Sequence, residues 1–265
     1  MKKIISIVAI AMALVLGIVG LTACGNKTVD ETEVTTEAVN TAKVYKIVAD
    51  NSFAPFEFAD EANGGYTGID MDLMAAIAED QGFEYTMDNC GWDASLANLG
   101  SGQADAMIAG MTITEERQET YDFTDAYFED GQTLFTVKGS DITTLEDLAG
   151  KKVAVKTGTM GAEYANSICD EYGFKIETFE GSDEVYQAVI AGNVDAGTED
   201  FSVISYKIEN SGLDLQLLGE KVNVKPYGVA VQKGMNAEFV QMFNAGLANI
   251  KANGVYDEIL AKYGM

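Results

Sequence analysis

The stretch Gly102-Gln103-Ala104-Asp105-Ala106-Met107-Ile108-Ala109 joins a glycine turn to a short apolar run, directly after a predicted helix over residues 93–100. The same G-x-x-D-A pattern returns at Gly192-Asn193-Val194-Asp195-Ala196, after a predicted helix over residues 183–191. A helix, a glycine turn and a buried strand in succession are typical of the second half of a βαβ unit. The repeat therefore predicts an α/β protein with two lobes of one design.

The segments around each copy of the repeat complete the pattern. In the first lobe they are a strand at 45–49, a helix from Asp70 as N-cap to Gly82 and a strand at 83–87; in the second they are a strand at 152–155, a helix at 161–171 and a strand at 175–178. The last segments are a strand at 226–231 and amphipathic helices at 237–249 and 255–262. Because consecutive strands joined by helices run parallel, we expect each lobe to hold a mostly parallel sheet flanked by helices.

The chain is expected to cross between the lobes twice. If residues 129–226 form an inserted second lobe, residues 43–128 and 227–265 together form the first. The two crossings, near 127–131 and 224–228, would then act as a hinge. In open α/β sheets, ligands bind beyond the carboxyl ends of the strands. We therefore expect the loops at these ends to face each other across a cleft between the lobes.

The beginning of the chain is typical of an exported lipoprotein. Two lysines precede an apolar run at 4–19, which suits a signal-peptide core. This run leads into Leu21-Thr22-Ala23-Cys24, which resembles the bacterial lipobox, whose cysteine is acylated. An ordinary secretory cleavage beside an incidental cysteine is the alternative. We predict a signal peptide over 1–23, lipidation of Cys24 at the extracytoplasmic face of the cell membrane, and a flexible acidic linker over 24–42.

Composition excludes several classes of function. The chain has 42 Asp and Glu against 17 Lys and Arg, for a formal charge of −25, so nucleic acid is a poor partner and the membrane is expected to be reached only through the lipid. It has no histidine, which excludes Ser-His and Cys-His catalysis. No dinucleotide, Walker or EF-hand motif is found either, so we predict no cofactor, no metal and no enzymatic activity.

The two remaining cysteines, Cys90 and Cys169, fall in different predicted lobes. A disulfide between them would prevent the lobes from moving about the hinge. We therefore expect both thiols to be free and at least partly buried.

Arg117 is the only arginine, against sixteen lysines. A guanidinium is planar and can donate two parallel hydrogen bonds to a carboxylate, which an ammonium cannot. This predicts a ligand carboxylate at Arg117. The alternative is a surface ion pair with Glu115, Glu116 or Asp122, a role that a lysine would fill equally well.

Four motifs follow one another along the chain: Phe53-Ala54-Pro55-Phe56-Glu57-Phe58, Gly68-Ile69-Asp70-Met71-Asp72-Leu73, Ala109-Gly110-Met111-Thr112-Ile113-Thr114-Glu115-Glu116-Arg117 and Asp122-Phe123-Thr124-Asp125. Together they resemble bacterial extracellular solute-binding protein family 3, the polar amino-acid-binding lipoproteins of ABC importers, and within it the glutamine-binding members. The resemblance covers the chain after the linker. It implies a periplasmic-binding-protein-like fold with two crossover hinge strands and ABC permease subunits as partners.

The resemblance also implies how both poles of an amino acid are held. The α-carboxylate would meet Arg117 and backbone N–H groups around Thr112 and the Thr159-Met160 turn. The α-ammonium would meet Asp200, the Gly110 carbonyl and the Thr112 hydroxyl. Because Arg117 and Asp200 belong to different predicted lobes, ligand binding would favour a closed state.

For the ligand side chain, the resemblance implies an aromatic sandwich and a polar end. Phe53 and Trp92 match the aromatic positions, whereas Phe56 and Phe58 are assigned to the core. Asp50 and Lys156 match the positions that contact the distal amide of glutamine. Without the resemblance, the aromatic residues would be assigned to the core and Lys156 to a solvated loop.

Two positions depart from the glutamine-binding members, which carry a histidine where this chain has Glu199 and a glycine where it has Met160. A carboxylate at Glu199 could favour a cationic ligand side chain, or it could pair with Lys156. Ala109, beside Gly110, completes the twelve residues expected to line the site.

We therefore predict an extracellular lipoprotein, expected to be monomeric, that captures a polar L-amino acid, glutamine first, and delivers it to an ABC importer. The alternatives are a binder of a basic or other polar amino acid (arginine, lysine, histidine or cystine) in transport or sensing, and more remotely a dehydratase-like enzyme with Glu199 as general base.

Overall fold

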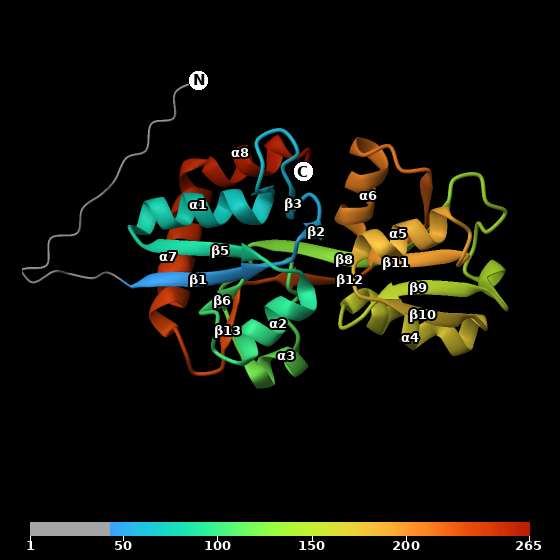
Figure 1. Cartoon of the computed structure of the whole chain (residues 1–265), viewed down its shortest axis with the longest axis horizontal. Helices are drawn as coiled ribbons and strands as arrows, with labels where there is room; N and C mark the ends of the chain where they lie inside the picture. Colours follow the sequence, from blue (N-terminus) through green and yellow to red (C-terminus); the bar gives the residue numbers. More distant parts are fainter. Residues whose placement is uncertain (1–42) are drawn as a thin grey trace, which may run out of the picture. The chain divides into compact units, whose positions relative to one another are not determined.

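The computed structural model describes residues 43–265, so the predicted signal peptide, Cys24 and the linker lie outside the described residues. Two five-stranded sheets with helices packed against them form two lobes (Figure 1). The predicted two-lobed α/β class is confirmed.

The first sheet has the strand order β5-β1-β6-β13-β7. Its strands are β1 (Val44–Ala49), β5 (Glu84–Asn89), β6 (Ala106–Met107), β7 (Tyr121–Phe123) and β13 (Ala230–Gln232). β1 pairs in parallel with β5 and β6, as the βαβ pattern predicted, whereas β13 pairs antiparallel with β6 and β7. A small antiparallel sheet follows β1 and consists of β2 (Ser52–Phe53), β3 (Glu57–Ala59) and β4 (Tyr66–Thr67).

The second sheet repeats this arrangement in the order β10-β9-β11-β8-β12. Its strands are β8 (Phe128–Val137), β9 (Lys152–Lys156), β10 (Lys175–Phe179), β11 (Ala196–Asp200) and β12 (Leu215–Tyr227). β9 pairs in parallel with β10 and β11, and β8 runs antiparallel to β11 and β12. Each sheet is therefore mixed rather than mostly parallel, because the segments that leave and re-enter a lobe add antiparallel strands.

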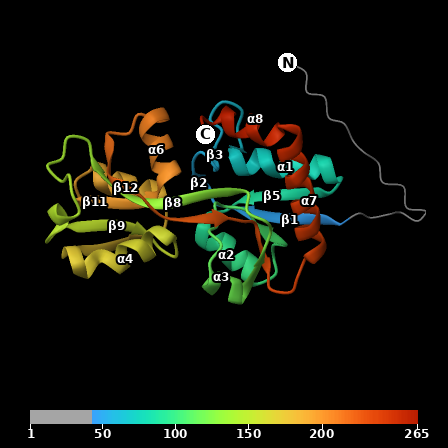
Figure 2. The same cartoon turned by 180° about the vertical axis from the view of Figure 1, so that it is seen from behind.

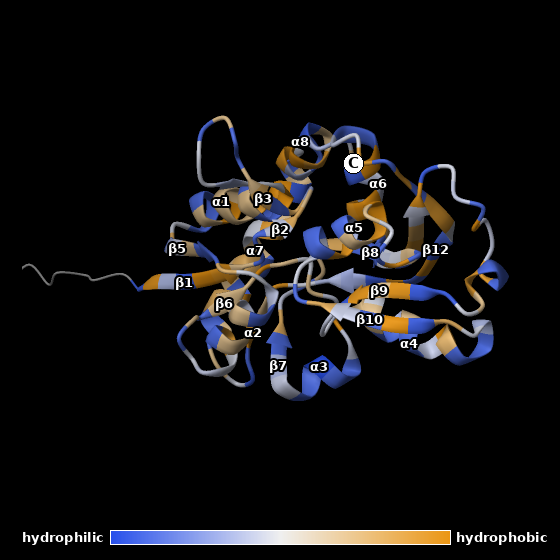
Figure 3. Ribbon diagram, turned by 45° about the vertical axis from the view of Figure 1, so that its right-hand side comes forward, coloured by the Kyte–Doolittle hydropathy of each residue, from blue (hydrophilic) through white to orange (hydrophobic). Residues whose placement is uncertain are grey.

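Hydrophobic residues on both faces of each sheet attach the helices. Those of the first lobe are α1 (Ile69–Gln81), α2 (Trp92–Gly100), α3 (Glu115–Thr120), α7 (Ala237–Asn253) and α8 (Val255–Lys262). Those of the second are α4 (Met160–Tyr172), α5 (Ser182–Ile190), α6 (Phe201–Asn210) and the short 3-10 helix η1 (Glu146–Leu148). On β9, Val153 and Val155 pack with the α4 core while Ala154 packs with the α5 core, as expected of a strand buried on both faces. Figure 3 shows β9 as a mainly hydrophobic strand.

The two lobes are joined by β8 and β12, which run side by side from one lobe to the other (Figures 1 and 2). Phe128 pairs with Tyr227 and Asp130 with Lys225 in this ladder. Both expected crossings lie on these strands, while the lobe boundaries after residues 128 and 226 stay a prediction. The expected continuous strand at 226–231 is wrong, because β12 ends at Tyr227 and the chain joins the first sheet only at Ala230, as β13. Gly228 lies in the break, where a Cβ would be 2.9 Å from Ile113.

The start of α1 differs from the prediction. The N-cap is Gly68, with φ 139, and the helix begins at Ile69, so Asp70 is not the N-cap. A side chain at Gly68 would overlap the Phe56 carbonyl, which leaves glycine as the residue that fits. Asp70 is instead fully buried and turned into the first lobe. The predicted end of the helix at Gly82 is confirmed, with a left-handed C-cap at φ 70.

Cys90 and Cys169 are both free and partly buried, as predicted. Among residues 43–265, no helix is both long enough and apolar enough to cross a bilayer.

Candidate functional site

The carboxyl ends of parallel strands place polar side chains at one edge of each lobe. Asp50 directly follows β1 in the first lobe, and Lys156 ends β9 in the second. Glu199 and Asp200 end β11, which lies beside β9 in the same sheet. This is the edge at which open α/β sheets bind ligands.

A pocket lies where these edges meet. All twelve residues expected from the sequence line it: Asp50, Phe53, Trp92, Ala109, Gly110, Thr112 and Arg117 from the first lobe, and Lys156, Thr159, Met160, Glu199 and Asp200 from the second.

The Arg117 guanidinium lies on the first-lobe side of the pocket. The Thr114 hydroxyl caps α3 by accepting the Arg117 N–H at 3.1 Å, which anchors the backbone of this residue. The side chain donates from Nη1 to the Thr112 carbonyl at 2.9 Å and from Nη2 to the Gly158 carbonyl of the second lobe at 3.2 Å. It also lies over the Trp92 ring, 5.4 Å from its centroid.

Arg117 forms no ion pair with a carboxylate among residues 43–265. The alternative of a surface pair with Glu115, Glu116 or Asp122 is therefore wrong, and Asp122 pairs with Lys233 at 3.0 Å instead. Arg117 is partly buried, and among residues 43–265 its guanidinium donates hydrogen bonds only to neutral carbonyls, so its charge remains available for an anionic ligand group.

Asp200 is the N-cap of α6 and lies on the second-lobe side. Its buried carboxylate accepts hydrogen bonds from Gln132 Nε2 at 3.2 Å and from the Tyr227 hydroxyl. Burial, helped by the nearby Glu199 and Asp130 carboxylates, raises the pKa of Asp200 to about 7. Within residues 43–265, no lysine or arginine forms an ion pair with it.

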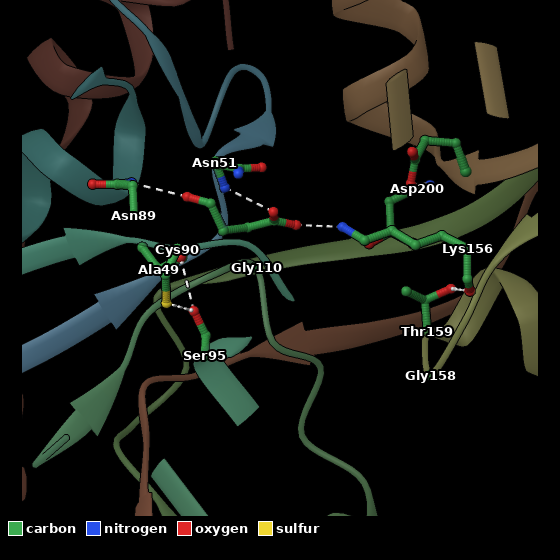
Figure 4. Close-up of polar contacts among 12 residues, drawn as sticks. Ala49, Asn51, Asn89, Cys90, Ser95, Gly110, Lys156, Gly158, Thr159 and Asp200 are labelled. Carbon is green, nitrogen blue, oxygen red and sulfur yellow. Dashed lines mark hydrogen bonds and ion pairs between the residues drawn. The ribbon is translucent and has the colours of Figure 1, made fainter. Parts of the chain in front are cut away.

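Lys156 and Asp50 form a buried ion pair between the lobes. Figure 4 shows the Lys156 side chain extending away from Thr159 toward the segment that carries Asn51. The Asn51 N–H donates to Asp50 Oδ1 at 2.7 Å and fixes the carboxylate. Burial alone would lower the pKa of Lys156, but the Asp50 and Glu199 carboxylates outweigh it and raise this pKa.

Glu199 is held by the protein rather than by Lys156. Its carboxylate accepts the Tyr186 hydroxyl at 2.7 Å and the Asp200 backbone N–H at 3.0 Å. Of the two roles left open by the sequence, a direct pair with Lys156 is not formed, because Lys156 is bound to Asp50. Glu199 thus adds a negative charge to the pocket that no lysine or arginine of residues 43–265 pairs with.

Two aromatic rings line the pocket as expected. Lys156 Nζ lies 5.5 Å from the centroid of Phe53 and 5.7 Å from that of Trp92, so both rings are near the interlobe ion pair. Phe53 also packs against Phe56, at 5.7 Å between centroids, and so belongs to the core as well. Phe56 is fully buried as assigned, whereas Phe58 is only partly buried at the edge of the core.

The start of α4 also lines the pocket, through Thr159 and Met160. The Thr159 hydroxyl caps the helix by accepting the Ala162 N–H at 3.3 Å and donates to the Lys156 carbonyl at 2.8 Å (Figure 4). Met160 is the first helical residue. The free N–H groups and positive dipole end of a helix N-terminus favour an anion, as expected for the carboxylate of an amino acid.

The comparisons with known proteins agree with this geometry. Residues 45–265 match the sequence model described as bacterial extracellular solute-binding proteins, family 3. The chain belongs to this family. This family-3 protein is 34% identical to a probable histidine-binding protein of Neisseria gonorrhoeae, over 96% of this chain and 94% of that one. It is 32% identical to the ABC transporter glutamine-binding protein GlnH of Bacillus subtilis, over 99% and 97%.

A solved structure of an ancestral arginine-binding protein bound to arginine superposes on this family-3 protein with a TM-score of 0.77. It shares 38% identity and covers 84% of this chain and 98% of the other. These relatives are binding proteins, which supports an amino-acid-binding solute-binding protein of an ABC transporter.

Sequence reasoning missed the residues behind the pocket lining. The hydroxyls of Tyr186 and Tyr227 hold Glu199 and Asp200, and Gln132 of β8 also binds Asp200. For a different buried group the sequence did carry a signal. Glu57 is an acid between two phenylalanines, and the structure places it fully buried in β3. An acid in such a position requires a partner.

Proposed function

We propose that this family-3 protein captures a polar L-amino acid, with glutamine favoured, in the pocket between its lobes and delivers it to an ABC importer. The observation that carries the proposal is a pair of opposite charges, Arg117 and Asp200, in one pocket and without counter-ions among the described residues. An α-amino acid carries the matching carboxylate and ammonium at its two poles.

The energetics are sufficient for tight binding. A hydrogen bond to a charged group contributes about 1.5–3 kcal/mol in a shielded site. Two such contacts at each pole approach the roughly 8 kcal/mol that corresponds to a micromolar dissociation constant. Because the contacts come from both lobes, the ligand stabilises the closed arrangement over any open one.

Glutamine is favoured by the Asp50–Lys156 pair. A carboxamide has one acceptor and one donor group, and it can accept from the Lys156 ammonium while it donates to the Asp50 carboxylate. Inserted between them, it would replace the direct ion pair without leaving either charge unsatisfied. A ligand carboxylate at this end would face Asp50 and Glu199, so glutamate is disfavoured.

A second candidate is a basic amino acid, which Glu199 favours. Together with Asp50 it makes the side-chain end of the pocket negative overall against the single charge of Lys156. A guanidinium or ammonium would offset this excess. The relatives named above are described as binding histidine, glutamine or arginine, which agrees with either ligand class.

The remaining parts of the proposal concern location and partners. Lipidation of Cys24 would hold the protein on the extracytoplasmic face of the membrane, beside the permease subunits that receive the ligand. We propose that it works as a monomer and that it binds without converting its ligand.

Calorimetric titration tests the function. The protein, stripped of co-purified ligand by partial unfolding and refolding, is titrated with each of the twenty amino acids. We expect binding of one amino acid per chain for glutamine or for the basic amino acids, with the ligand recovered unchanged. No heat with any amino acid would overturn the proposal, and a converted product would favour the dehydratase alternative.

A further inference from the structure

Two carboxyl groups are fully buried in the first lobe and lie outside the proposed ligand contacts. Glu57 is in β3 and Asp70 is in α1, and neither has exposed surface. Burial, together with the Asp70 and Asp50 charges, raises the pKa of Glu57 well above its usual range. Burial also raises the pKa of Asp70, to about 6. Burial therefore favours the protonated form of both carboxyl groups.

Asp70 connects this pair to the pocket. Its Oδ2 accepts the Gly110 N–H at 3.1 Å and the Tyr127 hydroxyl at 3.0 Å, and the Gly110 N–H also lies 3.1 Å from the Tyr127 oxygen. Within residues 43–265, neither Glu57 oxygen nor Asp70 Oδ1 has a donor from any other residue. The Gly110 N–H and the Tyr127 hydroxyl are therefore the donors through which the structure holds Asp70.

The backbone of Gly110 is closely packed against its neighbours. Its φ of 54° is in the left-handed region, and a Cβ there would overlap the Phe53 ring and come within 3.2 Å of Tyr227. The residue lines the pocket, and its carbonyl is the acceptor expected for the ligand ammonium. The Gly110 N–H and the Gly110 carbonyl belong to adjacent peptide units joined at this Cα, so a shift of the Cα or a change in its φ or ψ would change the direction of that carbonyl.

We propose that Asp70 and Tyr127 are positioning residues, which hold the Gly110 N–H and so fix the backbone of this residue with its carbonyl aligned with the α-ammonium of the bound amino acid. This inference rests on the proposed function. It assigns Asp70 a role at one pole of the ligand only, which separates it from a general contribution to folding.

Asp70→Asn tests the proposal with two probes, L-glutamine and glutaramic acid, which is glutamine without its α-amino group. We expect L-glutamine affinity to fall about tenfold, the difference between a charge-assisted and a neutral hydrogen bond. Glutaramic acid affinity should stay within about twofold, because it has no ammonium to align. Equal losses for both probes, or no loss for either, would overturn the proposal.

Two further variants separate positioning from folding. Tyr127→Phe removes the hydroxyl that donates to Asp70 and accepts from the Gly110 N–H, and it should lose about threefold for L-glutamine alone. The matched control is Tyr256→Phe, which removes a hydroxyl that donates to the Tyr127 carbonyl at 2.6 Å but contacts neither Asp70 nor Gly110. This control should leave the ratio of the two affinities unchanged.

The wild-type titration keeps the two proposals distinguishable. If the wild type binds arginine rather than glutamine, the probes become L-arginine and 5-guanidinopentanoic acid, with the same expected ratio. If it binds no amino acid, the proposed function fails and the inference with it. If it binds and Asp70→Asn weakens both probes alike, the inference alone fails.

Discussion

Asp70 in the first lobe and Asp200 in the second are both buried acids that accept a hydrogen bond from a tyrosine hydroxyl, but we propose different roles for them. Asp70 is bonded by Tyr127 and Gly110, and Asp200 by Tyr227 and Gln132. Burial is the main cause of a raised pKa at both, about 6 and about 7. Only Asp200 lines the pocket. Burial and a shifted pKa alone therefore do not identify a ligand site.

What separates the two acids is whether they reach the pocket. Asp70 accepts a backbone N–H and a hydroxyl from its own lobe, and its Oδ1, which has no donor among residues 43–265, does not line the pocket. Asp200 accepts hydrogen bonds from two neutral side chains, Gln132 and Tyr227. Its carboxylate lines the pocket, where it can accept further hydrogen bonds. An acid that the protein leaves incompletely bonded at a cavity is the one available to a ligand.

The largest expected effect comes from breaking this difference with Asp200→Asn. The variant replaces the partner of the ligand ammonium by a neutral amide, so affinity for every amino acid should fall about 100-fold, from loss of one or two charge-assisted bonds. Calorimetry measures the loss. The ligand-free protein should melt no lower than wild type at pH 8, because a buried charge has been removed. Affinity within threefold of wild type would contradict the assignment.

Arg117→Lys should have the next largest effect, at the opposite pole. The variant keeps the charge but loses the bidentate hydrogen-bond donor. We expect affinity to fall about tenfold, by the same factor for all amino acids. Competition against a radiolabelled amino acid would rank them. A change in ranking would mean that Arg117 contacts the side chain instead of the carboxylate.

Lowering the pH should weaken binding while it stabilises the empty protein. Between pH 8 and pH 6, Asp200 takes up a proton at a pKa of about 7, so affinity should fall up to about tenfold. For stability the sign is opposite: an acid whose pKa is raised by folding binds its proton more tightly when folded, so its contribution is full below about pH 4 and is lost as the pH rises through about 7.

Thermal melts with and without ligand measure both trends. Asp200→Asn is the control for affinity, and its pH dependence between 6 and 8 should be nearly flat. A wild-type affinity that does not change over this range would show that Asp200 is ionised throughout.

The smallest effect is expected at Glu199. Glu199→Gln keeps the shape and the Tyr186 contact but removes the charge, so cationic amino acids should lose about fivefold relative to glutamine. Tyr186→Phe keeps the charge and removes its hydroxyl donor, and it should alter the ranking by less than about twofold. An unchanged ranking in Glu199→Gln would remove the support for a basic ligand.

Much of the site was predictable because strand ends are local features. Asp50 and Lys156 stand at the ends of short β-rich runs, and the α/β rule brings such ends together, whereas their roles toward a ligand, and that of Asp200, came from the family resemblance. The single arginine, Arg117, led to the prediction of a contact with the ligand carboxylate. The direct contact between Asp50 and Lys156, 106 residues apart, needed the lobes to be placed relative to each other.

The supporting residues could not be predicted in the same way. Tyr227 reaches Asp200 across 27 residues, and Tyr127 reaches Asp70 across 57. Periodicity places such side chains on a buried face but does not say which polar atom they meet there. For Asp70, a position in the first turn of a helix favoured capping, and the tertiary contact with Gly110 took precedence.

Trp92 gives the protein a built-in optical reporter. It is the single tryptophan in the chain, its ring lies in the pocket near Arg117 and Lys156, and its indole N–H has no acceptor among residues 43–265. Indole emission responds to nearby charges and to exchange of water. Arrival of an amino acid should therefore change the intensity and wavelength of fluorescence, so that association and release can be followed in real time without any attached dye.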